Sequence, residues 1–176
     1  MKKPDIETCY HEAGHAVAAV ILGIPLERVD VYRNLYKNRI GFCKPKKGFH
    51  LKDFDKLNRV EKLHNNLEWA RRSALMTLAG PAAQAKYKGV PVHDIDGTGG
   101  DFDDTVFKSP IIDFEHTLEK AISLNNESDI WDSVVAVSKY LENFWKIYPD
   151  TLNTIISSII TKQRMREIRF RYAGSL

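Results

Sequence analysis

Residues 5–22, DIETCYHEAGHAVAAVIL, combine a helical period of apolar side chains with a closely spaced set of polar ones. Apolar residues recur at three- and four-residue steps, the spacing of one face of an α-helix; they are Ile6, Tyr10, Ala13, Val17, Val20 and Ile21. Asp5 is suited to cap the amino end of this helix. Gly23 and Pro25 are expected to end it, so the stretch predicts one helix between Asp5 and Gly23.

The same helix carries His11, Glu12 and His15 in the pattern H-E-x-x-H. Four residues make just over one turn, so both imidazoles project from one face and can bind one metal ion, with Glu12 beside them. Such a metal acts as a Lewis acid on water, and the glutamate takes and returns the proton. A shuffled chain of this composition would contain the pattern roughly once in a hundred cases. The alternative is a helix whose two histidines are only core or surface residues.

A catalytic zinc site needs a third protein ligand, which must come from elsewhere in the chain. Five aspartates lie in or just after the glycine-rich loop between Gly89 and Gly100, namely Asp94, Asp96, Asp101, Asp103 and Asp104. The remaining histidines are scattered and lack partners at ligand spacing; they are His50, His64, His93 and His116. The residues alone therefore leave the third ligand open among the five aspartates.

Beyond the motif, the pattern predicts a small hairpin followed by helices. Residues 26–32 and 40–43 alternate apolar and polar side chains, as half-buried strands do. Residues 55–87 have helical spacing, with Gly80-Pro81 expected to kink or split that helix. Four further helical stretches follow, at residues 101–107, 114–124, 129–145 and 149–172.

Composition narrows the class of protein. A chain of 176 residues and 20.1 kDa with 43% hydrophobic residues fits one domain with a substantial core. The net charge of +3 gives no reason to expect nucleic acid or a membrane as partner, and the basic run from Lys162 to Arg171 is expected to be a solvated helix face. No apolar signal core follows the amino end, and Cys9 and Cys43 could form at most one bridge. We therefore expect a cytoplasmic protein with reduced thiols.

Several segments resemble, in order, the peptidase domain of the FtsH family of ATP-dependent zinc proteases. Residues 10–17, YHEAGHAV, resemble its zinc motif, and residues 25–31 resemble the strand that follows. Ile40-Gly41-Phe42 is similar to its Leu-Gly-Tyr strand, and residues 78–84 to its Leu-Gly-Gly-Arg-x-Ala-Glu helix. Residues 97–102, GTGGDF, are similar to Gly-Ala-Ser-Asn-Asp-Leu. The resemblance covers about residues 8–107.

The resemblance implies an α+β, predominantly helical, zincin-type domain spanning residues 1–176, with a motif-bearing part at 1–107 and a helical part at 108–176. It selects Asp101 as the third ligand of Zn²⁺ beside His11 and His15, with Glu12 as the catalytic residue. Zincin chemistry further suggests that Ile40, Gly41 and Phe42, within residues 39–43, form an edge strand that pairs with an extended peptide. The alternative is a strand that only covers the core. The expected activity is hydrolysis of peptide bonds in peptides or unfolded segments.

Two differences from the family give the alternative function. Gln84 stands where the family has a glutamate, and a neutral amide orients a ligating imidazole less well than a carboxylate. These 176 residues also contain no Gly-x-x-x-x-Gly-Lys-Ser/Thr phosphate loop, so a separate unfoldase or regulator would have to supply substrate. Because the family assembles as rings, an oligomer is compatible with the resemblance. The alternative is a catalytically silent zinc-binding module that recognises a partner.

Overall fold

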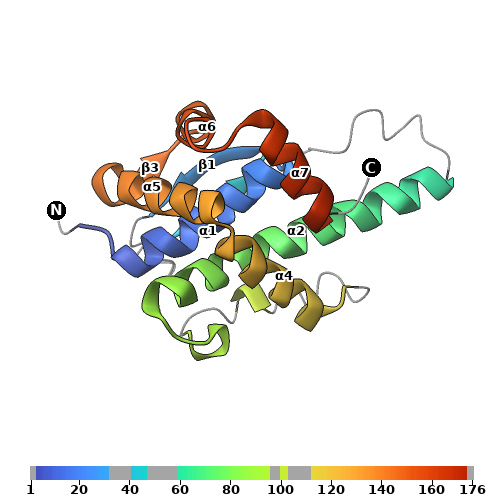
Figure 1. The fold of residues 1–176 in the computed structure, drawn as a ribbon, viewed down its shortest axis with the longest axis horizontal. Helices are drawn as coiled ribbons and strands as arrows, with labels where there is room; N and C mark the ends of the chain where they lie inside the picture. The colour runs from blue at the N-terminus through green and yellow to red at the C-terminus, as the bar shows by residue number, and fades with distance from the viewer. Residues whose placement is uncertain (1–2, 32–40, 47–58, 96–99, 103–111, 174–176) are drawn as a thin grey trace.

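The structure is a computed structural model that describes residues 3–31, 41–46, 59–95, 100–102 and 112–173. The described chain is mostly helical, with a small three-stranded antiparallel sheet (Figure 1). This confirms the α+β, predominantly helical expectation at that level. The elements run in the order α1 (Ile6–Leu22), β1 (Leu26–Asp30), β2 (Phe42–Pro45), α2 (Arg59–Lys88), η2 (Val92–Asp94), α4 (Phe114–Asn126), α5 (Ser128–Phe144), β3 (Lys146–Ile147), α6 (Pro149–Ser157) and α7 (Lys162–Ala173).

The motif helix α1 has the ends that its sequence predicts. The Asp5 carboxylate accepts a hydrogen bond of 3.0 Å from the backbone N–H of Thr8, and Gly23 ends the helix in the left-handed conformation at φ 73°. Figure 1 shows α1 between α2 and α5, and it packs against both. Most of its surface is buried, which suits a helix that is apolar nearly all round.

The long helix α2 approaches α1 closely and is continuous. A Cβ on Gly14 of α1 would lie 2.5 Å from the carbonyl oxygen of Ala79, so only glycine allows this approach. The expected kink or split at Gly80-Pro81 did not break the helix: α2 runs from Arg59 to Lys88 with Pro81 inside it. Packing against α1 and α4 outweighs the cost of the proline, and Asn125 of α4 donates to the Ala79 carbonyl at 3.2 Å.

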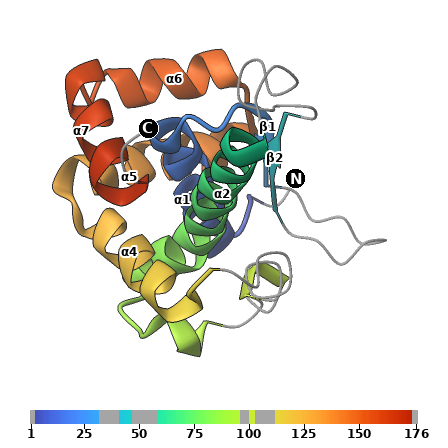
Figure 2. The same ribbon diagram turned by 90° about the vertical axis from the view of Figure 1, so that its right-hand side faces the viewer.

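The sheet has the strand order β2-β1-β3, with both pairs antiparallel. The second strand was expected at residues 40–43, but β2 covers Phe42–Pro45, pairing Asp30 with Phe42 and Leu26 with Pro45. Ile40 and the predicted turn lie outside the described residues. The third strand, β3, was not predicted because two residues are too short to show alternation. Figure 2 shows β1 and β2 on one side of the α1–α2 helix pair and α4 on the opposite side of that pair.

The carboxy-terminal stretch forms two helices rather than the single one expected at residues 149–172. The helix α6 ends at Ser157, and α7 begins at Lys162 after Thr161, whose hydroxyl accepts a hydrogen bond of 3.2 Å from the backbone N–H of Arg164. A threonine at this position caps a new helix, which competes with continuing the old one. The prediction missed this because the apolar period continues through the junction.

The basic residues of α7 are only partly a solvated face. Lys162 and Arg166 are exposed, as expected. Arg164 forms ion pairs with Glu127 at 2.7 Å and with Asp129 at 2.9 Å, and Arg171 also pairs with Glu127. Arg169 donates to the carbonyl of Ile21 at 2.6 Å, at the carboxyl end of α1, where a cation is favourable. None of the described helices is long and apolar enough to cross a membrane.

Candidate metal centre

Three side chains from two segments meet at one point beside α1. The Nε2 atoms of His11 and His15 lie 3.0 Å apart, and the Oδ2 atom of Asp101 lies 2.9 Å from the first and 3.7 Å from the second. Asp101 comes from the short helical segment at residues 100–102. The structure thus brings together the two motif histidines and the aspartate that the resemblance selects.

The other ligand candidates do not join this group within the described part of the chain. Asp94 lies in η2 and is not a member of the group. His93 packs edge-on against Phe102 with ring centroids 6.2 Å apart, and His116 is exposed on α4. Outside the described residues lie Asp96, Asp103, Asp104 and His50, and His64 lies in the first turns of α2, whose side chains the structure does not describe.

Phe102 anchors the segment that presents Asp101. Its ring packs edge-on against Phe114 as well as against His93, with centroids 5.4 Å apart in the first pair. Phe114 begins α4, and His93 lies in η2. The contacts of Phe102 with η2 and α4 therefore fix the position of the adjacent Asp101.

The spacing of the three ligand atoms suits a zinc ion. Zinc binds imidazole nitrogen and carboxylate oxygen at about 2.0–2.2 Å, so two ligands of a tetrahedral site lie about 3.3 Å apart. The observed separations of 2.9, 3.0 and 3.7 Å fall around this value. The three side chains are 9–25% exposed, which leaves a path for an ion or a water molecule.

The outer hydrogen bonds of the histidines direct lone pairs toward this point. His15 Nδ1 lies 2.9 Å from the carbonyl oxygen of Met76, and His11 Nδ1 lies 3.0 Å from Oε1 of Gln84. Both partners are acceptors, so each Nδ1 carries a proton and each Nε2 faces the group, where loss of its own proton would leave a lone pair for a metal ion. Two lone pairs and the carboxylate of Asp101 then converge, an arrangement that a cation would satisfy.

The electrostatics of the group favour positive charge. Burial opposes protonation of His15, but the hydrogen bond and the charge of Asp101 outweigh it and raise the pKa of His15 to about 9. Burial also disfavours the charge of Asp101, yet its hydrogen bonds with His11 and His15 hold the pKa of that carboxyl well below its usual value. A divalent cation would receive the same stabilisation from Asp101.

Glu12 lies beside the group as a buried carboxylate. It is 6% exposed, and its Oε2 atom has no hydrogen-bond partner among the described residues. Burial raises the pKa of Glu12, while the nearby His15 and His11 oppose that rise. A buried carboxylate with a raised pKa, and with one oxygen that has no hydrogen-bond partner among the described residues, is suited to take and release a proton.

Two glycines make room for these side chains. A Cβ on Gly80 of α2 would lie closer than 3.0 Å to three atoms of the His15 ring, and one on Gly41 would meet the carboxylate of Glu12 equally closely. Gly80 was predicted only as a helix breaker. A glycine in the middle of an otherwise strong helical pattern was the available signal, since it often marks a close packing contact.

The predicted substrate strand lies next to Glu12. Gly41 touches the glutamate, and Phe42 begins β2, which is an edge strand of the described sheet. Ile40, the third residue of the predicted strand, lies outside the described residues. The strand thus borders the candidate site on the side where Glu12 is found.

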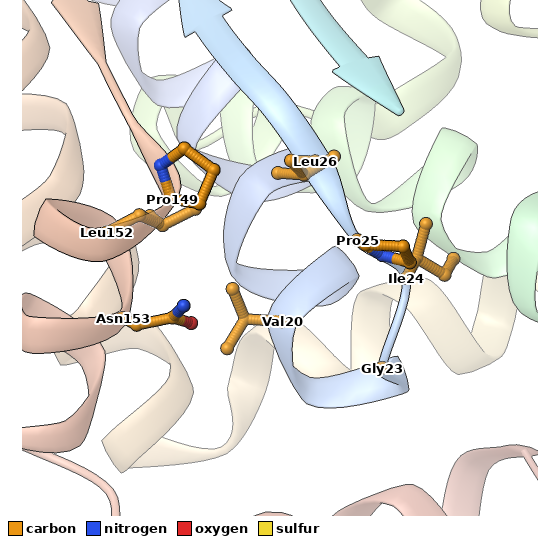
Figure 3. Close-up of a pocket in the computed structure, with 8 residues that line it drawn as sticks. All are labelled: Val20, Gly23, Ile24, Pro25, Leu26, Pro149, Leu152 and Asn153. Atoms are coloured by element: carbon orange, nitrogen blue, oxygen red, sulfur yellow. The ribbon is translucent and has the colours of Figure 1, made fainter. Parts of the chain in front are cut away.

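An apolar pocket of about 270 Å³ lies at the other end of α1 (Figure 3). Val20, Leu26 and Pro149 are among its lining residues, and Asn153 is the polar side chain among them. Gly23, a lining residue, lies eight positions after His15, which corresponds to about 12 Å along the helix axis. The pocket offers no metal ligand and is separate from the His11–His15–Asp101 group.

Comparison with protein-family models and with curated proteins finds no match to this chain.

Proposed function

We propose that this chain is a zinc metallopeptidase whose fold is the zincin-type peptidase domain of the FtsH family. The single observation that supports it best is the convergence of His11, His15 and Asp101 beside the buried carboxylate of Glu12. Two histidines, one carboxylate and an adjacent glutamate are the set that a catalytic zinc site of this kind uses.

In this proposal His11, His15 and Asp101 hold one Zn²⁺ through Nε2, Nε2 and Oδ2. A bound zinc ion supplies Lewis acidity, which lowers the pKa of water and polarises a carbonyl group. The hydrogen bonds from Nδ1 of His15 to the Met76 carbonyl and from Nδ1 of His11 to Gln84 Oε1 fix the orientation of both imidazoles, with Nε2 turned toward the proposed ion.

Glu12 is the proton carrier of the proposed reaction. Its Oε2 atom takes a proton from the attacking water and delivers it to the nitrogen of the leaving amine. Burial disfavours the charged form of this carboxyl and raises the pKa of Glu12. The contact with Gly41 holds the carboxylate on the side of the ligands that β2 borders.

The proposed substrate is an extended peptide or an unfolded segment that pairs with β2, an outer strand of the described sheet, at Gly41 and Phe42. Main-chain pairing of this kind is indifferent to most side chains, so it suits unfolded protein substrates. A proline at Gly41 does not test it cleanly, because its Cβ would also displace Glu12.

The test compares the wild type with Glu12→Gln for zinc content and for cleavage of casein, an unstructured protein. The glutamine is nearly the same size and cannot accept the proton, so the variant should keep its zinc and lose at least about 100-fold in kcat. Cleavage by the variant at the wild-type rate would contradict the assigned role of Glu12.

The second candidate is a catalytically silent zinc-binding module, which Gln84 favours because an amide raises the basicity of His11 less than a carboxylate does. It predicts zinc in the wild type without cleavage of casein. A wild type that binds no zinc would contradict both candidates.

A further inference from the structure

We infer that Glu7 is a positioning residue for the metal centre: acting through Gln84, it sets which nitrogen of His11 faces the metal. The inference rests on the proposed metal site and adds to it a residue that contacts no ligand directly. Glu7 lies one helical turn before His11 on α1.

A chain of polar contacts leads from the ligand to the surface. The Oε1 atom of Gln84 lies 3.0 Å from His11 Nδ1, and its Nε2 atom donates to Oε2 of Glu7 at 3.4 Å. The Nζ atom of Lys88 donates to the same Glu7 oxygen at 3.0 Å. Gln84 and Lys88 are four residues apart on α2, so both face the first turns of α1.

Gln84 alone would not determine the tautomer of His11. A side-chain amide has an accepting end and a donating end of nearly the same shape, and rotation by 180° exchanges them. With Oε1 toward His11, the imidazole carries its proton on Nδ1 and keeps the Nε2 lone pair for the metal. With Nε2 toward His11, the tautomer that suits the amide places the proton on the metal-binding nitrogen.

Glu7 selects the productive orientation because an ionised carboxylate only accepts hydrogen bonds. Its partner on Gln84 must therefore be the NH₂ group, which turns Oε1 toward His11. Lys88 holds the Glu7 carboxylate in place. In a direct carboxylate–histidine pair the carboxylate contacts the ligand itself, whereas here Gln84 lies between the Glu7 carboxylate and His11.

This role depends on residue 84 being an amide. A carboxylate there accepts at both oxygens and needs no neighbour to orient it. Glu7 should consequently matter in the wild type and cease to matter in Gln84→Glu, where it would instead repel a second negative charge. A purely structural role of Glu7, as an acidic residue in the first turn of α1, would be the same in both backgrounds.

The experiment is a double-mutant cycle on zinc affinity, measured by competition with a chromophoric chelator. Glu7→Ala should weaken zinc binding about tenfold in the wild-type background, the lower end of the range for outer partners of a metal ligand. In the Gln84→Glu background the same substitution should cause no loss. The matched control is Glu119→Ala, which removes an exposed carboxylate of α4 and should leave zinc affinity unchanged.

An equal loss from Glu7→Ala in both backgrounds, or no loss in the wild type, would overturn the inference. The ¹⁵N resonances of the His11 ring in the metal-free protein give a readout that needs no zinc. They should report a proton on Nδ1 in the wild type and loss of that proton in Glu7→Ala; an unchanged Nδ1 resonance would overturn the inference. Absence of zinc binding by the wild type would contradict the proposed function, and the resonances would still decide the role of Glu7.

Discussion

Replacing Gly80 by alanine should remove metal binding while leaving the helices in place. The new Cβ would lie closer than 3.0 Å to the Cε1, Nε2 and Cδ2 atoms of His15. The ring would have to move by roughly 1 Å to restore an ordinary carbon contact of about 3.5 Å. It cannot do so freely, because it is buried and its Nδ1 atom is hydrogen-bonded to the Met76 carbonyl.

A displacement of this size exceeds what a zinc ligand tolerates, since ligand distances hold within about 0.2 Å. We expect the zinc affinity of Gly80→Ala to fall about 100-fold, together with a loss of about 1–3 kcal/mol in the free energy of unfolding from overpacking. The assay is chelator competition, with circular dichroism to verify that the variant is folded.

Gly100→Ala is the matched control, because a Cβ at that position next to Asp101 meets no atom within 4 Å. It should bind zinc like the wild type. If folded Gly80→Ala bound zinc with the affinity of the wild type, the reasoning would be refuted that His15 can bind zinc only because Gly80 leaves room for its ring.

Three further predictions concern the proton carrier, the charge of the site and the end of α1. Gly41→Ala should lower casein cleavage about tenfold or more with zinc retained, because its Cβ would displace the Glu12 carboxylate. Although burial opposes the charge of His15, its hydrogen bond and ion pair with Asp101 raise the pKa of His15 to about 9. In metal-free protein, prepared with a chelator, this ion pair therefore stabilises the fold fully below pH 6.5, and the stabilisation is lost as the pH rises to 9. The urea concentration needed for unfolding should fall across that range. Arg169→Met should cost about 1.5 kcal/mol in unfolding free energy, because it removes hydrogen bonds to carbonyls at the end of α1.

Each of these predictions has a control. Loss of zinc in Gly41→Ala would show that its effect is not confined to Glu12. Asp101→Asn should remove the fall in stability between pH 6.5 and 9, and persistence of that fall would assign it to other groups. Arg166→Met removes an exposed charge from the same helix as Arg169 and should leave stability unchanged; equal losses in both variants would contradict the capping role.

The parts of the fold that depend on local chemistry were predictable from the sequence. The Asp5 side chain caps the amino end of α1, Gly23 ends the helix in the left-handed conformation, and the four-residue spacing of His11 and His15 places both on one face. Spacing alone left the third ligand open among five aspartates. The family resemblance selected Asp101, whose position depends on contacts of Phe102 with distant elements.

The parts that depend on tertiary contacts were not predictable from local patterns. Pro81 remains inside α2 because neighbouring helices hold it there, and β3 exists only through its pairing with β1. Gly80 was predicted only to kink or split the helix, because a glycine inside a helical pattern does not show which residue packs against it, here His15. The contact of Glu7 with Gln84, 77 positions apart, has no periodic signal at all.

The zinc content of the purified chain, measured by elemental analysis for the wild type and for Asp101→Ala, tests the central claim most directly. The account predicts one zinc ion per wild-type chain, and loss of most of it in Asp101→Ala because a three-ligand site would be reduced to two histidines. A folded wild-type chain that takes up no zinc, or an Asp101→Ala variant that retains one ion with wild-type affinity, would contradict it.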